Sequence, residues 1–346
     1  MPSHQEIEAV CMAALLGAGV PREHAKQQFS LLMEAELRGY ASHGLLRLPR
    51  VIERIGNKVV DPLQKGAMSW RGTAFLDVDG MQGLGPVVAS KALELVGHRA
   101  RETGVAVAAI RNCDHLGMLG WYAEKVAAQG QILLAFTISE ALVHPWGGRK
   151  AMLGTNPIAI GIPAVPEPFV VDMATSVVAM GKIHDHSIRE EPIPPDWALD
   201  AAGNPTTDAT AAKDGAIAPF GGAKGYALGL AFEVLVGSLT ACALGTAVKG
   251  TLDSTNACNK GDLFVVIEPQ EGSAKTVSAF LDEIRQSPAS DADRPVRVPG
   301  DRAASLRDRR AGGDIPVSPE IWERLLGLAD IDQQSLSKRS VNRMPH

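Results

Sequence analysis

The chain has few aromatic residues, few cysteines and no long uninterrupted apolar run. Aromatic side chains make up 5% of its 346 residues, so we expect a core built from aliphatic and alanine side chains. The apolar stretch that comes closest to a membrane span, residues 226–244, contains Glu233, Ser238 and Thr240. A buried helix of a soluble protein is therefore expected there rather than a transmembrane segment.

Neither the cysteines nor the charge point to a secreted or a nucleic-acid-binding protein. The four cysteines form no C-x-x-C pair, and the N-terminal residues lack a signal-peptide pattern. We therefore expect reduced thiols in a cytoplasmic protein. The net charge of −5 lacks the basic excess that attracts phosphate groups, so we expect no nucleic acid and no membrane surface as a partner.

The glycine fingerprint of a dinucleotide-binding Rossmann unit, G-x-G-x-x-G between a strand and a helix, is also missing. The nearest cluster, Gly80, Gly83 and Gly85, has the wrong order of spacings. Strand and helix patterns nevertheless alternate through the middle of the chain, which predicts a layered α/β core. Strands are expected at 73–78, 105–110, 132–138, 158–162, 169–171 and 263–267. Helices are expected at 85–103, 117–129, 177–188, 225–244, 275–286 and 319–328.

The first part of the chain is predicted to be helical. Ser3 and Glu6 form a capping box before a helical apolar stripe, and Pro21 opens a second helix. We expect a helical module over residues 1–70, joined by C-terminal helices within 300–346, and an α/β core over 71–299. The proline-rich segment 192–220 is expected to be a long ordered loop.

The segment RGYASHGLLRLPR, residues 38–50, concentrates groups that suit chemistry on a small acid. Ser42 is predicted to cap a short helix in which His43 and Arg47 share a face, and Pro49 is predicted to disturb that helix. Arginine binds a carboxylate through two parallel hydrogen bonds, and histidine transfers a proton near neutral pH. Taken alone, however, the segment is more typical of a capped surface helix.

Four further segments carry polar groups in positions typical of ligand sites. Residues 112–117, NCDHLG, follow a predicted strand and precede a helix whose N–H groups suit an anion. Residues 153–176 offer hydroxyl and amide groups between short strands. Residues 221–225, GGAKG, and 298–302, VPGDR, resemble anion-binding turns, although the former lacks the Walker spacing. Ordinary cap and turn chemistry explains each of these segments when it is considered alone.

A metal site is considered at the sequence MGKIHDH. His184 and His186 alternate in a way that places two ligands on one side of a strand. A third and a fourth ligand are not apparent nearby, so we expect no metal.

Taken in order, these motifs closely resemble the malate/L-lactate dehydrogenase family of NAD(P)-dependent oxidoreductases. The resemblance covers roughly residues 5–325 and rests on RGYASHGLLR, NCDHLG, HPWGGRKAMLGTNPIAIGIP, FVVDMATSVVAMGKI, EPIPPDWALDAAGNPTTD, FGGAKGYALGLAFEVL and VPGD. It implies a non-Rossmann NAD(P)-binding fold, with the N-terminal helical module packed on a mixed-sheet core. This agrees with the missing glycine fingerprint.

The resemblance also implies roles for individual residues. His43 matches the catalytic acid/base, Ser42 its orienting partner and Arg47 the ligand of the substrate carboxylate. The other implied substrate contacts are His115, Thr155, Thr175 and Ser176. The implied cofactor contacts are His115, Leu116, Gly117, Met118, Leu119, Ser139, Asp172, Met173, Ala174, Lys182, Lys224, Gly225, Gly300, Asp301 and Arg302.

We therefore expect reversible hydride transfer between a nicotinamide and C2 of a small 2-hydroxy or 2-oxo acid of the malate, lactate or sulfolactate type. The alternatives are reduction of a cyclic imine, piperideine- or pyrroline-2-carboxylate, and ureidoglycolate dehydrogenation. A binding protein that has kept the fold without activity is a further alternative. The cofactor is expected to be NAD or NADP, with NADP slightly favoured by Arg302. The resemblance implies a homodimer.

Overall fold

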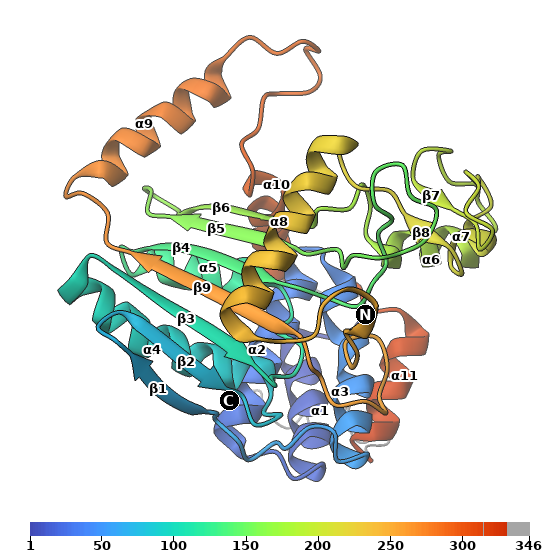
Figure 1. Ribbon diagram of the computed structural model, residues 1–346, viewed down its shortest axis with the longest axis horizontal. Coiled ribbons are helices and arrows are strands. Elements are labelled where there is room, and N and C mark those ends of the chain that lie inside the picture. The colour runs from blue at the N-terminus through green and yellow to red at the C-terminus, as the bar shows by residue number, and fades with distance from the viewer. Residues whose placement is uncertain (314, 331–346) are drawn as a thin grey trace, which may run out of the picture.

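The centre of the molecule is a mixed sheet of seven strands (Figure 1). The computed structural model describes residues 1–313 and 315–330. The strand order is β1-β2-β3-β9-β4-β5-β6, and β2 and β3 are the parallel pair while the other neighbours are antiparallel. The strands are β1 (Ala67–Arg71), β2 (Phe75–Asp79), β3 (Val105–Arg111), β4 (Ile132–Thr137), β5 (Ile158–Ile162), β6 (Phe169–Met173) and β9 (Gly261–Ile267). This confirms the predicted layered α/β core.

Helices cover both faces of the sheet because side chains alternate along each strand. Helices α4 (Gly85–Thr103) and α5 (Leu119–Ala128) pack on one face, where Phe264 and Val266 of β9 join their core. Helix α8 (Ala223–Thr240) crosses the other face, where Leu263 of β9 belongs to its cluster (Figure 1). Gly161 of β5 lets α5 approach closely, since a Cβ there would lie 2.2 Å from the carbonyl oxygen of Ala123.

A second core joins the N-terminal helices to the last described helix. Helices α1 (His4–Gly17), α2 (Arg22–Leu37) and α3 (Leu48–Gly56) share an apolar cluster with α11 (Pro319–Leu328). Helix α10 (Asp301–Ala311) lies against α2, where Arg307 bonds Glu34 over 2.6 Å. The division of the chain at residues 70 and 300 stays a prediction, and residues 314 and 331–346 lie outside the described part. Strand β1 already belongs to the sheet, although it falls partly within the range assigned to the helical module.

Four short elements form a small unit with its own core beside the sheet (Figure 1). Helix α6 (Met180–Ile188), the short helix α7 (Ala209–Ala212) and the strand pair β7 (Ala198–Leu199) and β8 (Ala216–Ile217) share a small apolar core. The segment 192–220 is therefore not one continuous loop, because Ala198 and Ile217 pair across it. Helix α9 (Ser273–Gln286) projects from the body (Figure 1).

Most predicted elements are confirmed within a few residues at their ends. The predicted helices 85–103 and 319–328 coincide with α4 and α11. The predicted helix 177–188 begins later, at Met180. Strand β1 was not predicted, because only Met68 and Trp70 alternate with polar residues in it, and so short a pattern is a weak signal. Within the described ranges, no helix is both long and apolar enough to cross a membrane.

Candidate active site

A cavity of about 280 Å³ lies where the α2–α3 connection meets the ends of β4 and β6. Its wall combines apolar side chains with hydroxyls, two histidines and Arg47. The predicted site residues that line it are Ser42, His43, Arg47, His115, Leu116, Gly117, Met118, Leu119, Ser139, Thr155, Asp172, Met173 and Ala174. The fold thus brings most of the predicted residues together from five separate segments of the chain.

The segment that carries His43 and Arg47 is folded differently from the prediction. It forms two 3₁₀ turns, Ala41–His43 and Leu45–Arg47, separated by Gly44, instead of one helix capped by Ser42. Pro49 does not disturb a helix but stands in the first turn of α3, where its missing N–H has no intrahelical partner to lose.

Glu36 explains why the chain breaks at Gly44. The buried Glu36 carboxylate accepts a hydrogen bond from the backbone N–H of Leu45 over 3.1 Å. A Cβ at Gly44 would lie 2.1 Å from a carboxylate oxygen of Glu36, so only glycine fits there. Burial raises the pKa of Glu36, and its bond to Leu45 opposes that rise. A tertiary contact from α2, which the local spacing does not reveal, therefore sets the shape of this turn.

The turn holds Arg47 in a defined orientation. Its Nε donates to the backbone oxygen of Ser42 over 2.7 Å. Among residues 1–313 and 315–330, its two terminal nitrogens have no hydrogen-bond partner. Burial, and secondly the charge of Arg50, lower the pKa of Arg47 to about 10. Arg47 therefore offers a fixed, unpaired guanidinium to an anion in the cavity.

His43 and His115 face each other at the same place. Their ring centroids are 5.7 Å apart and the rings are inclined by 29°, a stacked arrangement. The Nδ1 of His43 lies 3.1 Å from the hydroxyl of Ser42. Burial, and secondly the Arg47 charge, lower the pKa of His43 to about 4. The same two causes lower the pKa of His115 well below its ordinary value.

The loop after β3 fixes the tautomer of His115. The backbone N–H of Gly117 donates to His115 Nδ1 over 3.0 Å, so in the neutral ring the proton is on Nε2. Gly117 has a φ of 76°, and a Cβ there would lie 2.2 Å from Leu31. Both the backbone conformation and the space therefore require glycine.

Other predicted residues line the cavity from the sheet side. Asp172, near the end of β6, accepts a hydrogen bond from the backbone N–H of Gly120 over 2.6 Å. Burial raises the pKa of Asp172 to about 6, although that hydrogen bond opposes the rise. The hydroxyl of Ser139 accepts from the N–H of Thr155 over 3.0 Å. Glu233 of α8 stabilises the loop that contains Thr155. Its carboxylate accepts a hydrogen bond from the side-chain amide of Asn156 over 2.7 Å.

Several predicted contacts do not line the cavity in the described part of the chain. The hydroxyl of Thr175 donates to the backbone oxygen of Thr155 over 2.9 Å, and that of Ser176 donates to Val178 over 2.8 Å, so both are engaged. Lys182 lies 4.7 Å above the ring of Trp197. The remaining residues without a place in the wall are Lys224, Gly225, Gly300, Asp301 and Arg302. Their predicted cofactor contacts stay predictions.

The sequence HDH lies on helix α6 and not on a strand, so His184 and His186 do not share one side as an alternating strand pair would. His186 Nδ1 is 3.1 Å from the carbonyl oxygen of Pro192, and its ring packs on Trp197. In the described ranges, no three His, Cys, Asp or Glu side chains are grouped as a metal site requires.

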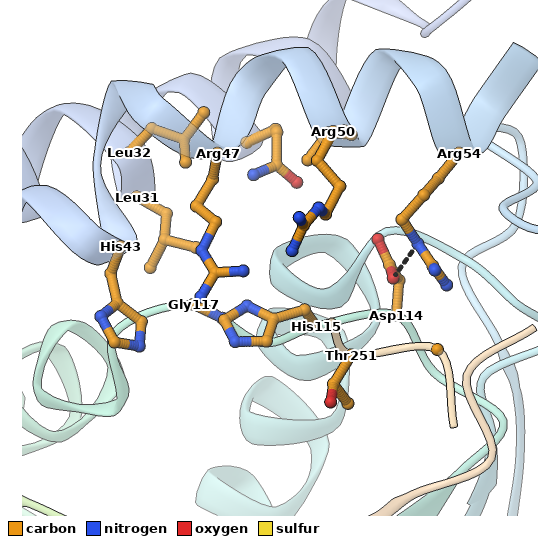
Figure 2. Close-up of a pocket in the computed structure, with 13 residues that line it drawn as sticks. Leu31, Leu32, His43, Arg47, Arg50, Arg54, Asp114, His115, Gly117 and Thr251 are labelled. Carbon is orange, nitrogen blue, oxygen red and sulfur yellow. Dashed lines mark hydrogen bonds and ion pairs between the residues drawn. The ribbon is translucent and has the colours of Figure 1, made fainter. Parts of the chain in front are cut away.

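Sequence reasoning missed three charged residues at the site, Arg50, Arg54 and Lys260. Arg50 and Arg54 continue the face of α3 that begins with Arg47, and Arg54 forms a buried ion pair with Asp114 over 3.0 Å (Figure 2). Their spacing of three and then four residues was a readable signal of a shared face. Lys260 lines the cavity and pairs with the buried Asp262, but no sequence motif indicates it.

Residues 3–326 match the family model described as Malate/L-lactate dehydrogenase. The chain belongs to this family. It is 35% identical to a malate/(S)-sulfolactate dehydrogenase of Methanothermus fervidus, with 95% of this chain and 97% of that protein covered. It is 32% identical to a Δ1-pyrroline-2-carboxylate reductase of Ancylobacter novellus, over 93% and 96% of the two chains.

Solved structures agree with this assignment. A dehydrogenase from Sinorhizobium meliloti superposes with a TM-score of 0.92 at 47% identity, covering 95% of this chain and 97% of that chain. The sulfolactate dehydrogenase of Methanocaldococcus jannaschii superposes with a TM-score of 0.89 at 34% identity, covering 96% and 98%. The protein is therefore an NAD(P)-dependent oxidoreductase of the malate/L-lactate dehydrogenase family.

The chemistry of the cavity wall fits the nicotinamide end of such a cofactor. Leu116, Met118 and Ile138 offer an apolar surface to a flat ring. The hydroxyls of Ser139 and Thr155 offer hydrogen bonds to an amide. Ligand pockets combine an apolar wall with a few placed polar groups in this way.

The low pKa of His43 makes stability depend on pH. The pKa of His43 is about 4 in the folded protein and about 6.5 when unperturbed, so the unfolded chain binds this proton at higher pH. The contribution of neutral His43 to the free energy of unfolding is fully present above pH 6.5 and is lost as the pH falls to about 4. We expect the difference in unfolding free energy between the wild type and His43→Asn to fall by up to about 3 kcal/mol over this range.

Urea unfolding followed by circular dichroism at several pH values measures this difference. His98→Asn, at an exposed position of α4, is the matched control. A difference that stays constant from pH 6.5 to pH 4 would show that burial does not hold His43 neutral.

Proposed function

We propose that this protein transfers a hydride reversibly between NAD(P) and C2 of a small 2-hydroxy or 2-oxo acid. The observation that carries the proposal is the unpaired Arg47 guanidinium beside the stacked His43 and His115 rings, in one cavity. An arginine orients a carboxylate and a histidine moves a proton. Bound NAD(P) supplies or accepts the hydride in this chemistry.

Arg47 would hold the substrate carboxylate. Because its Nε is already committed to the Ser42 oxygen, the guanidinium cannot rotate freely, and its two terminal nitrogens remain for the carboxylate. A planar fork of this kind fixes the acid in one orientation. It would thereby place C2 of the acid next to the two histidines.

His43 would move the proton. In reduction the protonated ring donates to the carbonyl oxygen as C2 accepts the hydride, and in oxidation the neutral ring removes the hydroxyl proton. The Arg47 charge is one cause of the low pKa of His43, so a bound carboxylate that balances this charge favours the protonated ring. Ser42 would orient His43, and His115 would donate its Nε2–H to the reacting oxygen.

The cofactor would lie along the sheet side of the cavity. The residues that support this placement line the cavity and come from the loop after β3 and the ends of β4 and β6: residues 116–119, Ser139 and residues 172–174. Contacts from Thr175, Ser176, Lys182, Lys224, Gly225 and residues 300–302 are proposed from the family resemblance alone. NADP is slightly preferred over NAD on the strength of Arg302.

A second candidate is reduction of the C=N bond of a cyclic imine that carries a 2-carboxylate. The Ancylobacter novellus relative is named for such a reaction, and Arg47 would hold the same carboxylate. Ureidoglycolate dehydrogenation remains a third reaction of this type. Initial rates with NADH and NADPH against a panel of 2-oxo acids and cyclic imines distinguish these candidates. Turnover of imines without turnover of 2-oxo acids would contradict the first proposal.

A homodimer is proposed as the working form. Helix α8 exposes an apolar face on which Leu228 is 40%, Val234 50% and Leu235 42% exposed. Helix α9, which projects from the body, exposes 59% of Phe280 (Figure 1). Apolar helix faces of this extent favour burial against a second surface.

Light scattering after gel filtration tests the homodimer. We expect a dimer for the wild type and a monomer for Val234→Glu, because a carboxylate on the α8 face would be buried on association. Leu63→Glu, at a position that is 64% exposed in a loop, is the control. A monomeric wild type would refute the proposal.

Replacing His43 tests its role in proton transfer. We expect His43→Ala to lower kcat by roughly 10²- to 10⁴-fold, the usual contribution of a positioned acid or base. The Kd of NAD(P)H, measured by fluorescence titration, is expected to change far less. Unchanged turnover would remove His43 from the proposed chemistry.

Arg47→Lys tests the carboxylate contact. The two-pronged guanidinium becomes a point charge, so we expect KM for the 2-oxo acid to rise at least tenfold while kcat changes less. Steady-state kinetics at saturating NADPH measure both constants. A normal KM would show that the acid binds elsewhere.

A further inference from the structure

A second cavity of about 30 Å³ adjoins the first one. Figure 2 shows the residues that line it. The two cavities share His43, Arg47 and His115 in their walls. The small cavity extends from them along α3, so it continues the proposed substrate site on the side of Arg50. At about 10–15 Å³ for one water, it has room for the oxygens of a single acid group.

Three arginines line this small cavity, Arg47 from the turn before α3 and Arg50 and Arg54 from α3 itself. Arg47, Arg50 and Arg54 follow one another at helical spacings of three and four residues, and all three line it (Figure 2). Of the three, Arg54 is neutralised, because its Nε bonds Asp114 over 3.0 Å. Its Nη1 also donates to the backbone oxygen of Asp253 over 2.7 Å.

The other two guanidinium groups have no such partner among residues 1–313 and 315–330. Within these ranges Arg47 donates only to the Ser42 carbonyl, which carries no charge. In the described part of the chain Arg50 has neither a hydrogen bond nor an ion pair. Asp114 is the single carboxylate in the wall of the small cavity, and it is engaged by Arg54.

Neighbouring charges do not balance this surplus. The Asp253 carboxylate is occupied by backbone N–H groups of its own loop, such as those of Thr255 and Asn256. Lys260 and Asp262 form a closed buried pair. Two adjacent cations, Arg47 and Arg50, therefore line one cavity, and their charges repel each other.

We infer that Arg50 binds a second acid group of the substrate, so that the protein prefers 2-oxo or 2-hydroxy acids with a carboxylate or sulfonate at the far end of a short chain. Residues three apart on a helix have Cβ atoms about 5–6 Å apart, which suits the two acid groups of a short diacid. Arg47 holds the acid group next to C2, and Arg50 holds the other. This inference rests on the proposed function and specifies its substrate.

The test compares acids that differ only at the far end. Reduction of oxaloacetate, of its 4-amide and of pyruvate by NADPH is measured for the wild type, Arg50→Gln and Arg50→Lys. The amide keeps the length of oxaloacetate but removes its second charge. Arg22→Gln, at an exposed position of α2, is the matched control.

We expect the wild type to prefer oxaloacetate over the amide at least tenfold in kcat/KM. Arg50→Gln should reduce this preference roughly 10- to 100-fold, the range of a hydrogen bond to a charged group, and act mainly through KM for oxaloacetate. Arg50→Lys should keep part of the preference, and Arg22→Gln all of it. Turnover of pyruvate by Arg50→Gln reports that the variant is folded.

Three outcomes would overturn the inference while the proposed function stands. In the first, the wild type has the same kcat/KM for oxaloacetate and its amide. In the second, Arg50→Gln lowers kcat/KM equally for all three acids. In the third, Arg50→Gln raises only the KM for NADPH. The last would assign Arg50 to the cofactor. If Arg50→Gln does not fold, the inference is tested by the wild type alone, through its ratio of kcat/KM for oxaloacetate to kcat/KM for the amide. No turnover of any 2-oxo acid by the wild type would instead refute the proposed function.

Discussion

The buried ion pair between Arg54 and Asp114 connects the parts of the chain from which the site is built. Arg54 belongs to α3, and Asp114 stands in the loop after β3, next to His115. The same guanidinium donates to the backbone oxygens of Asp253 and Asn256, in a loop that supplies Thr251 to the cavity. One side chain therefore holds together the helical part, the sheet and the covering loop. Removing one partner of such a pair commonly costs about 3–5 kcal/mol, because the other charge stays buried alone.

The electrostatics of the cavity depend on this ion pair, because it engages the carboxylate of Asp114. With Asp114 paired with Arg54, the described residues that line the small cavity offer no further carboxylate to Arg47 and Arg50. Burial and the Arg47 charge then hold His43 neutral, with a pKa of about 4. An anion that binds to Arg47 supplies the missing negative charge and removes one cause of that low pKa. Substrate binding and the protonation of His43 are in this way coupled by simple Coulomb attraction.

Much of the fold was readable from local patterns. The ends of α4 were predicted because Gly85–Pro86 starts it and Gly104 ends it with a φ of 81°. Helix α11 has Ser318 as its cap and Pro319 in its first turn. Strand β1 was missed because it lies at the edge of the sheet, where alternating burial leaves a weak pattern. The shape of residues 38–50 was predicted wrongly, because Glu36 and Gly44 determine it through a contact between segments.

By itself, the sequence determined the chemical content of the site and the family to which the chain belongs. The sequence motifs that resemble the family contain Ser42, His43, Arg47 and His115, and their order along the chain can be read directly from the sequence. The types of these residues define the chemistry that is available. Only the tertiary structure decided which of these groups share a cavity. It stacked His43 on His115 and paired Asp114 with Arg54, and in the part of the chain that the structure describes it gave Arg47 and Arg50 no acidic partner. The physical reason is that pairing and burial of charge depend on distances between segments far apart in the chain, which no local spacing encodes.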